Sequence, residues 1–343
     1  MFRPMIDPYP LTFRPVLLGK TWGGRRLARY GKSLDDDTPL GESWELTDLD
    51  ATSSDGAGGG AAVSEIVNGP LAGRTLREAI ETFGAGLLGT LSPTDAGAFP
   101  LLVKFLDAGQ ELSVQVHPTP GYASTDPEAK LKTETWYILD AEPGAVLYKG
   151  LRDGLSLERF AEEIRNGRIV DCLDAVPARP GDCHHLPSGT VHALGGGIAL
   201  VEVQTPSDTT FRLWDWPDRY DRPGRTLHVR EALQSCLPGA APATTRLPDG
   251  ERRGLLADAG PYDLWEARLR AGEAWTHPSA ASACAVLVVL DGTITGVTDR
   301  GERGRSEIGP GGTVLVPPSC AETVRAGTDA RILAVGFPRQ GGS

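Results

Sequence analysis

Short apolar runs bounded by turn residues recur along most of this chain. Single runs span residues 103–108, 197–205 and 312–318, and two longer segments, 136–150 and 284–297, each contain a turn between two runs. Runs of four to eight residues that are rich in β-branched and aromatic side chains are typical of strands. The pattern therefore predicts a mainly β protein.

Two segments, near residues 75–90 and 156–175, instead predict helices. In the first, Thr75 is followed three residues later by Glu78, which is the arrangement of a capping box. In the second, Ser156 precedes apolar residues that recur at helical spacing and share one face. We expect both helices to be insertions between strands.

Composition supports short strands joined by many turns. The 343 residues include 43 Gly and 27 Pro, about a fifth of the chain and more than average usage. Helix interiors tolerate neither residue, whereas turns favour both. Residues 47–62 are too small and polar to pack, and we expect them to form a mobile surface loop.

A weak internal repeat indicates how the strands are arranged. Each copy has a strand that ends in Leu-Asp, then a Pro-Gly turn, then a further proline. The two copies place these features at residues 139–140, 180–181 and 187, and at residues 290–291, 310–311 and 317. A hairpin, a turn and a closing strand are how a jelly-roll or cupin barrel is built. We therefore expect two cupin-type barrels, with a small helical insertion in the N-terminal catalytic part.

The repeat also divides the chain into two predicted domains. We expect residues 1–240 to form a metal-binding catalytic cupin and residues 255–343 to form a C-terminal cupin-like β domain without metal ligands. The stretch between them is rich in proline, alanine and charge, which is typical of a linker. The position that matches His192 of the first copy is Glu322 in the second.

Charge and cysteine content restrict the partners and the compartment. The chain carries 34 Lys and Arg against 45 Asp and Glu, for a net charge of −11 and no long basic run. This argues against nucleic acid and anionic membranes as partners, and it allows an anionic small molecule in a locally basic pocket. The five cysteines are scattered without a CxxC pair, and no apolar run reaches membrane-spanning length. We expect a cytoplasmic protein.

Candidate metal ligands gather on predicted strands. Gln115 and His117 alternate along one strand and therefore share a face, while Glu134 begins another strand and His192 follows a turn. Two imidazoles and a carboxylate suit Zn²⁺ or Fe²⁺, and a glutamine oxygen is a rarer ligand. The alternative is that both histidines are ordinary buried residues bonded to the backbone. The gathering of four potential ligands on neighbouring strands favours a metal site.

Three charged residues near these strands each allow two interpretations. Glu202 lies on the same face of its strand as Leu200 and Gln204, where a carboxylate is either paired in a salt bridge or kept for metal binding or proton transfer. Arg212 is either a surface residue or a group that holds an oxyanion. Lys104 interrupts an apolar run, so it either snorkels or faces a polar pocket.

Several motifs together resemble the type I (zinc-dependent) mannose-6-phosphate isomerases, especially the short bacterial form. The segments PLLVKFLDAGQELSVQVHP, KTETWYILDAEPGA, LPSGTVHAL and SDTTFRLWDW occur in the order and spacing of that family. The resemblance covers about residues 20–235 well and the remainder loosely. Several motifs in order are far more specific than any one of them.

The resemblance implies an enzyme that interconverts mannose 6-phosphate and fructose 6-phosphate through an enediol and supplies mannose and GDP-mannose metabolism. It also implies one zinc ion per chain and a monomer or weak homodimer. The family's functional residues fall on the following positions: zinc ligands Gln115, His117, Glu134 and His192; active-site Arg212, Lys132 and the proton-moving carboxylate Glu202; phosphate-side Lys104 and Ser113.

Two other classes of protein fit parts of the pattern. A non-haem iron dioxygenase on a cupin fold also uses histidine and carboxylate ligands, and it would contain iron and consume oxygen. A sugar-binding cupin without catalytic activity would need no proton-transfer carboxylate beside its metal. The presence of Glu202, Arg212 and Lys132 therefore favours the isomerase.

Overall fold

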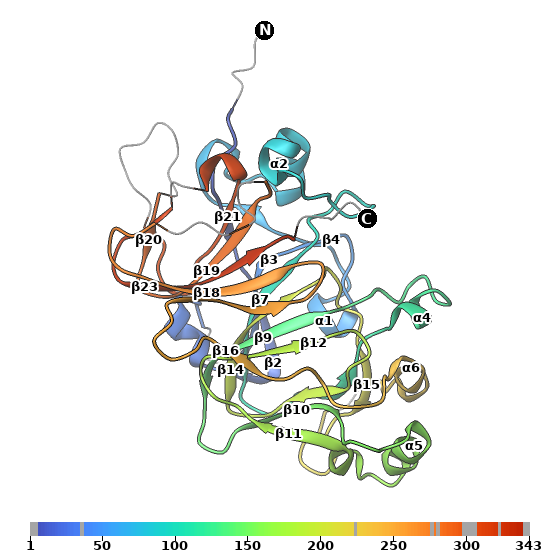
Figure 1. The fold of residues 1–343 in the computed structure, drawn as a ribbon. Coiled ribbons are helices and arrows are strands. Elements are labelled where there is room, and N and C mark those ends of the chain that lie inside the picture. The colour runs from blue at the N-terminus through green and yellow to red at the C-terminus, as the bar shows by residue number, and fades with distance from the viewer. Residues whose placement is uncertain are drawn as a thin grey trace.

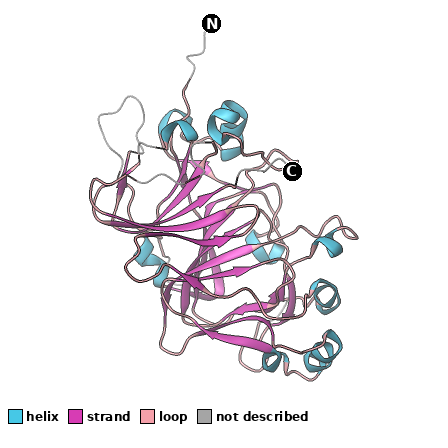
Figure 2. Ribbon diagram, viewed as in Figure 1, coloured by secondary structure: helices cyan, strands magenta, loops and turns pink. Residues whose placement is uncertain are grey.

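The structure is a computed structural model that describes residues 6–34, 38–222, 225–274, 278, 282–296, 307–321 and 324–338. Antiparallel sheets make up most of it, and the helices are short and lie on the outside (Figure 2). The prediction of a mainly β fold is confirmed. Within the described residues, no helix is long and apolar enough to cross a membrane.

Two sheets, most of whose strands lie in the lower half of Figure 1, form the first barrel. The larger contains, in spatial order, β16 (Thr245–Arg246), β12 (Asp182–Leu186), β9 (Glu134–Ala141), β14 (Ile198–Gln204), β7 (Leu102–Ala108), β2 (Val16–Gly24) and β3 (Leu40–Leu46). The smaller contains β11 (Leu173–Pro177), β10 (Val146–Leu151), β13 (His192–Leu194), β8 (Val114–Val116) and β15 (Phe211–Trp214). Buried apolar residues from both sheets, such as Leu200 and Leu147, form one cluster between them. The two sheets therefore enclose a common interior.

A third sheet, at the top of Figure 1, contains most of the strands of the predicted second domain. Its spatial order is β17 (Arg253–Asp258), β18 (Asp263–Leu269), β23 (Ala330–Gly336), β19 (Ala285–Asp291), β21 (Thr313–Val316), β1 (Leu11–Arg14) and β6 (Glu65–Ile66). Two small ribbons complete the strands: β20 (Ile294–Thr295) with β22 (Arg325–Ala326), and β4 (Asp48–Leu49) with β5 (Ala62–Val63). Leu11 of β1 is the partner of Leu315 in β21. The division after residue 240 stays a prediction, and β1 and β6 lie in the sheet of the C-terminal strands.

The second domain packs against the back of the first barrel's larger sheet. Val201 and Val203 of β14 belong to the same buried apolar cluster as Leu264 of β18 and Val335 of β23. Side chains of a strand alternate between its two faces. Glu202, which lies between the two valines, therefore points to the opposite face, towards the barrel interior.

Both predicted helices are present. The first comprises α2 (Leu76–Phe83), with the predicted capping box between Thr75 and Glu78, and α3 (Ala85–Leu88). The second comprises α5 (Leu157–Arg165), whose first turn is capped by Ser156, and the 3-10 turn η3 (Ile169–Cys172). The other helical elements are α1 (Ser54–Ala57), α4 (Pro120–Ala123), α6 (Val229–Ser235), η1 (Arg26–Tyr30), η2 (Gly69–Leu71) and η4 (Pro318–Cys320).

Residues 47–62 are buried at their ends, at residues 47–49 and 62, whereas most of residues 50–61 are exposed, as expected of a surface loop. That the segment is mobile stays a prediction. Asp48 is buried, and its carboxylate accepts hydrogen bonds from Arg77 Nε and from the backbone N–H of Phe99. A buried carboxylate that is paired in this way can anchor a polar segment. The predicted linker also contributes to the fold, because β16 adds Thr245 and Arg246 to the edge of β12.

Two further predictions concern particular side chains. The five cysteines are free thiols, as their scattered positions predicted. Glu322, the predicted counterpart of His192 in the second barrel, lies outside the described residues.

Candidate active site

Three side chains with metal-binding atoms meet where strands end in the first barrel. His117 follows β8, Glu134 begins β9 and His192 begins β13. Nε2 of His117 lies 3.3 Å from Oε2 of Glu134, and Nε2 of His192 lies 3.1 Å from Oε1 of the same carboxylate. All three residues are buried, and their ligand atoms lie within 4.8 Å of one another. The arrangement forms a possible three-residue metal site.

The protonation of both rings fits a metal. Nδ1 of His117 lies 3.0 Å from the carbonyl oxygen of Thr209, and Nδ1 of His192 lies 2.9 Å from that of Thr190. Because a carbonyl can only accept, Nδ1 carries a proton in both rings, and Nε2 is left as the ring nitrogen that could bind a metal. Burial and the nearby Lys132 lower the pKa of His117 to about 3, so its imidazole stays neutral. Nε2 of His117 is buried without a hydrogen-bond partner among the described residues, as expected for a ligand atom.

Gln115 lies beside this cluster. It pairs with His192 across β8 and β13, and its Nε2 lies 3.2 Å from Nε2 of that histidine. Its Oε1 accepts a hydrogen bond of 3.2 Å from Ser113 Oγ. In this orientation the amide nitrogen faces the ligand atoms, and a half-turn of the amide would bring the oxygen there instead. The role of Gln115 as a fourth ligand stays a prediction.

Two lysines and a second carboxylate adjoin the cluster. Lys132 Nζ lies 2.8 Å from Oε2 of Glu134 and 3.8 Å from Oε1 of Glu202. Lys104 Nζ lies 3.4 Å from the same Glu202 oxygen. Burial disfavours the charged form of Lys132, but Glu134 and Glu202 outweigh it and raise its pKa. Burial likewise opposes the charge of Glu134, but Lys132 and the two histidines hold its pKa well below the ordinary value.

A second set of residues at the site was not predicted. Glu42 on β3 lies 3.7 Å from Lys104 Nζ and 3.7 Å from Lys20 Nζ. Burial raises the pKa of Glu42, but the two lysines outweigh burial and lower it. Trp44 Nε1 donates to Glu42, and the ring of Trp44 lies 4.6 Å from Lys104 Nζ. The available signal was the alternation of "GESWEL", which places Glu42 and Trp44 on one face of a strand.

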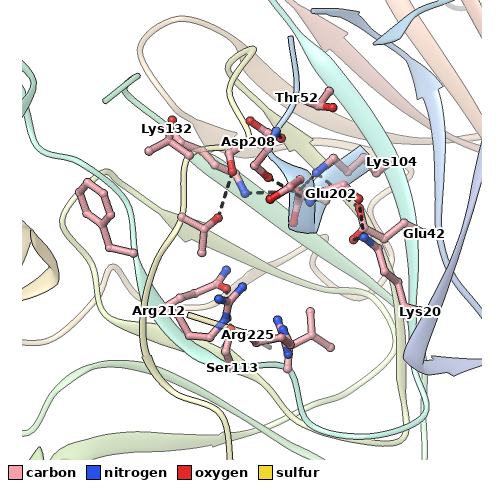
Figure 3. Close-up of a pocket in the computed structure, with 18 of the residues that line it drawn as sticks. Lys20, Glu42, Thr52, Lys104, Ser113, Lys132, Glu202, Asp208, Arg212 and Arg225 are labelled. Carbon is pink, nitrogen blue, oxygen red and sulfur yellow. Dashed lines mark hydrogen bonds and ion pairs between the residues drawn. The ribbon is translucent and has the colours of Figure 1, made fainter. Parts of the chain in front are cut away.

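These groups line a cavity of about 650 Å³. In Figure 3, Lys132, Glu202 and Lys104 lie on one side of the view, and Arg212, Arg225 and Ser113 lie on the other. Arg212 lies on β15, and its Nη1 donates a hydrogen bond of 2.7 Å to the carbonyl oxygen of Thr226. Lys20 and Glu42 also lie on the cavity wall.

All nine predicted site residues come together at this cavity or immediately behind its wall. Six of them line the cavity: Lys104, Ser113, Gln115, Lys132, Glu202 and Arg212. The other three form the buried ligand cluster. His184, by contrast, bonds through Nδ1 to Thr244 and is not part of that cluster.

Comparisons with known proteins point to one family. A family model described as phosphomannose isomerase type I, catalytic domain, matches residues 12–144. Mannose-6-phosphate isomerase ManA of Bacillus subtilis is 39% identical over 228 residues, which cover 66% of this chain and 67% of that protein. The mannose-6-phosphate isomerase of Streptococcus mutans is 36% identical over 231 residues, which cover 65% of this chain and 66% of that protein.

Solved structures extend the likeness over almost the whole chain. The crystal structure of the mannose 6-phosphate isomerase from Bacillus subtilis superimposes with a TM-score of 0.78 at 26% identity, covering 96% of this chain and 100% of that one. A variant of phosphomannose isomerase from Salmonella typhimurium has the same fold, with a TM-score of 0.72 at 17% identity, covering 96% of this chain and 100% of that one. The resemblance expected from the sequence motifs is confirmed, and the chain belongs to the type I phosphomannose isomerase family.

Proposed function

We propose that this isomerase interconverts mannose 6-phosphate and fructose 6-phosphate and that it uses one zinc ion per chain. The observation that carries the proposal is the buried cluster of His117, Glu134 and His192, which adjoins Glu202 at one cavity. A metal site beside a separate carboxylate provides both charge stabilisation and proton transfer, which an aldose–ketose interconversion requires.

The ligand set fits zinc. Two neutral imidazoles and one carboxylate are the ligands of many catalytic zinc sites, which keep a further position for water or substrate. Gln115 is the proposed fourth protein ligand, after its amide turns to present the oxygen. When bound, zinc polarises the carbonyl and hydroxyl oxygens of a sugar and stabilises the negative charge that develops on them.

Glu202 is the proposed base that moves a proton between C1 and C2. Its Oε2 accepts a hydrogen bond from Trp136 Nε1, and its Oε1 lies near the ammonium groups of Lys104 and Lys132. These contacts fix the carboxylate and compensate its charge despite burial. A base must stand at a defined place relative to the carbon whose proton it removes, and these three neighbours provide that placement.

Lys132 and Arg212 are the proposed stabilisers of oxygen charge. The raised pKa of Lys132 keeps its ammonium protonated, so it donates hydrogen bonds and does not act as a base. Arg212 presents its guanidinium on the other side of the cavity. A sugar between the two sides would be exposed to cations at both, which suits ring opening and enediolate formation.

Lys104 and Ser113 are the proposed phosphate-side residues. Binding energy from a remote phosphate positions the reacting end of a substrate and so contributes to the rate. Lys104 also contacts Glu202, so a substitution there would disturb phosphate binding and the base together. Ser113 Oγ donates to Gln115. Among the described contacts it has none with Glu202, so a substitution of Ser113 tests phosphate binding without removing a contact of the base.

We also propose that the protein acts in the cytoplasm as a monomer or weak homodimer and without nucleic acid. Five free thiols support a reducing compartment. The net charge of −11 argues against a polyanionic partner.

A coupled assay tests the proposed function. Conversion of mannose 6-phosphate should be measured beside conversion of unphosphorylated mannose, in protein purified without added metal and again after chelation and return of zinc. We expect efficient conversion of the phosphorylated sugar alone, loss with chelator and recovery with zinc. Bound iron with oxygen consumption would support a dioxygenase, and sugar binding without turnover would support a binding protein.

A further inference from the structure

The hydroxyl group of Tyr262 connects the C-terminal domain to the sheet that carries the site. Tyr262 precedes β18, is buried, and donates a hydrogen bond of 2.7 Å to the carbonyl oxygen of Val203. The same hydroxyl lies 3.0 Å from Oγ1 of Thr135, which in turn lies 3.1 Å from Nδ1 of His185. Three strands of the first barrel are therefore joined through one residue of the second domain.

The chemistry of these groups fixes the direction of the hydrogen bonds. The carbonyl of Val203 can only accept, so it takes the single hydroxyl proton of Tyr262. Thr135 must then donate its own proton to the Tyr262 oxygen, and His185 must donate from Nδ1 to Thr135. The hydroxyl groups of Thr135 and Tyr262 each accept one hydrogen bond and donate another. Hydrogen bonds that are linked in this way strengthen one another.

The chain of hydrogen bonds lies directly behind the proposed catalytic groups. Thr135 is the cross-strand partner of both His185 and Val203. The adjacent rungs of the same ladder pair Trp136 with Glu202 and Glu134 with Gln204. Because side chains alternate between faces, Glu134 and Glu202 point into the barrel while Thr135 and Val203 face the C-terminal domain.

We propose that Tyr262 is a positioning residue through which the C-terminal domain fixes the spacing of Glu134 and Glu202. The proposal rests on the proposed function, since it concerns the placement of a metal ligand relative to a base. On this proposal the C-terminal domain contributes to catalysis although none of its side chains needs to enter the cavity.

The physical reason is that the reaction depends on small displacements. A misplacement of about 1 Å can cost about a hundredfold in rate, and groups behind a metal ligand typically affect metal affinity about 10- to 100-fold. Loss of the Tyr262 hydroxyl removes the cross-link but leaves β9 and β14 paired. We therefore expect a partial loss of function without a loss of fold.

The matched variants are Tyr262→Phe and Tyr137→Phe in the full chain. Tyr137 is also buried between the domains, and its hydroxyl donates a hydrogen bond of 2.8 Å to Oε2 of Glu266. Each variant loses one buried interdomain hydroxyl, but Tyr137 does not bond to Thr135 or Val203 in the structure. Three quantities should be measured: kcat and KM for mannose 6-phosphate, the rate of zinc loss to a chelator, and the melting temperature.

For Tyr262→Phe we expect kcat to fall about tenfold with KM changed less than twofold, and zinc to be lost several-fold faster. For Tyr137→Phe we expect a similar fall in melting temperature with kcat and zinc loss unchanged. Equal changes in both variants, or a fall in melting temperature alone, would overturn the proposal. Should Tyr262→Phe fail to fold, Thr135→Val, which keeps the side-chain shape, carries the same expectation and the same contrary outcome.

The zinc measurement separates this proposal from the proposed function. If the unaltered protein does not isomerise mannose 6-phosphate, the proposed function fails. Faster zinc loss in Tyr262→Phe than in Tyr137→Phe would then still support the positioning of Glu134 from behind, and equal rates would contradict it.

Discussion

Trp136 donates a hydrogen bond of 2.9 Å from Nε1 to Oε2 of Glu202, its direct cross-strand partner on β14. The indole therefore holds one carboxylate oxygen while the other remains near two lysines. The ring of Trp136 also packs edge-on against His192, with 5.4 Å between ring centroids. One side chain thus contacts both the proposed base and a proposed metal ligand.

Replacing Glu202 by glutamine should stop proton transfer while leaving the metal in place. The amide keeps the size of the side chain but cannot accept the proton, so we expect kcat to fall by about 10²- to 10⁴-fold. Zinc content should be unchanged, because Glu202 is not among the three clustered ligand residues. Steady-state kinetics and metal analysis check both points. If the variant kept most of its activity with zinc bound, Glu202 would not be the base.

Replacing His117 by alanine should abolish stoichiometric zinc binding. The variant loses one of the three ligand residues that cluster in the described part of the chain, and the ring of His117 packs on that of His192. The second domain should remain folded, which circular dichroism and limited proteolysis can check. His184→Gln is the control, because it also removes a buried imidazole from this barrel but lies outside the cluster. Full zinc content in the alanine variant would refute the ligand assignment.

Replacing Ser113 by alanine should weaken recognition of the phosphate. We expect KM for mannose 6-phosphate to rise by about 10- to 100-fold, because one hydrogen bond to a charged group contributes about 1.5–3 kcal/mol. Any slow conversion of unphosphorylated mannose should be unaffected. Measuring kcat/KM for both sugars checks this prediction. An equal fall for the two sugars would show that Ser113 does not bind the phosphate.

Stability should decrease in acid partly through His184. Burial, with a smaller contribution from Lys149, lowers the pKa of His184 to about 3 in the folded protein, against about 6.5 in the unfolded chain. Between these values the unfolded state binds a proton that the folded state does not, so the free energy of unfolding falls as the pH falls from about 6.5 towards 3. Denaturant titrations at several pH values give the free energy of unfolding as a function of pH. The slopes of this function for the protein and for His184→Gln should differ by up to the amount that corresponds to one bound proton. Parallel curves would show that His184 does not titrate in this way.

The strand faces on which the candidate ligands lie could be predicted, because the evidence for them is local. Gln115 and His117 alternate on one strand, and Glu134 begins another, so the pattern of each segment already fixes the face on which each residue lies. The capping box at Thr75 is equally local, since Glu78 lies one helical turn away. Such features depend on neighbours within a few residues.

The other residues of the site and the anchoring of Asp48 depend on contacts between segments that are distant in sequence, which no local pattern encodes. Lys20 and Glu42 reach the site because β2 and β3 pair with each other and with β7, which is distant in sequence. Asp48 anchors the first residues of segment 47–62 because Arg77 lies opposite it in space. The composition of a segment does not show whether it has an ionic partner that is distant in sequence, so the burial of Asp48 could not be predicted.

The pairing of β1 with β21 has a consequence for how the protein reaches its native state. On the ribosome, Leu11 is synthesised long before its partner Leu315, so β1 must wait for almost the entire chain. Until β21 has been synthesised, the edge of β1 that will pair with it has no hydrogen-bond partners. Such an exposed strand edge can pair with a wrong strand. The pairing also ties residues 11–14 into the sheet of the C-terminal strands. The two domains are therefore expected to complete folding together, as a single cooperative event that depends on closure of a very large loop.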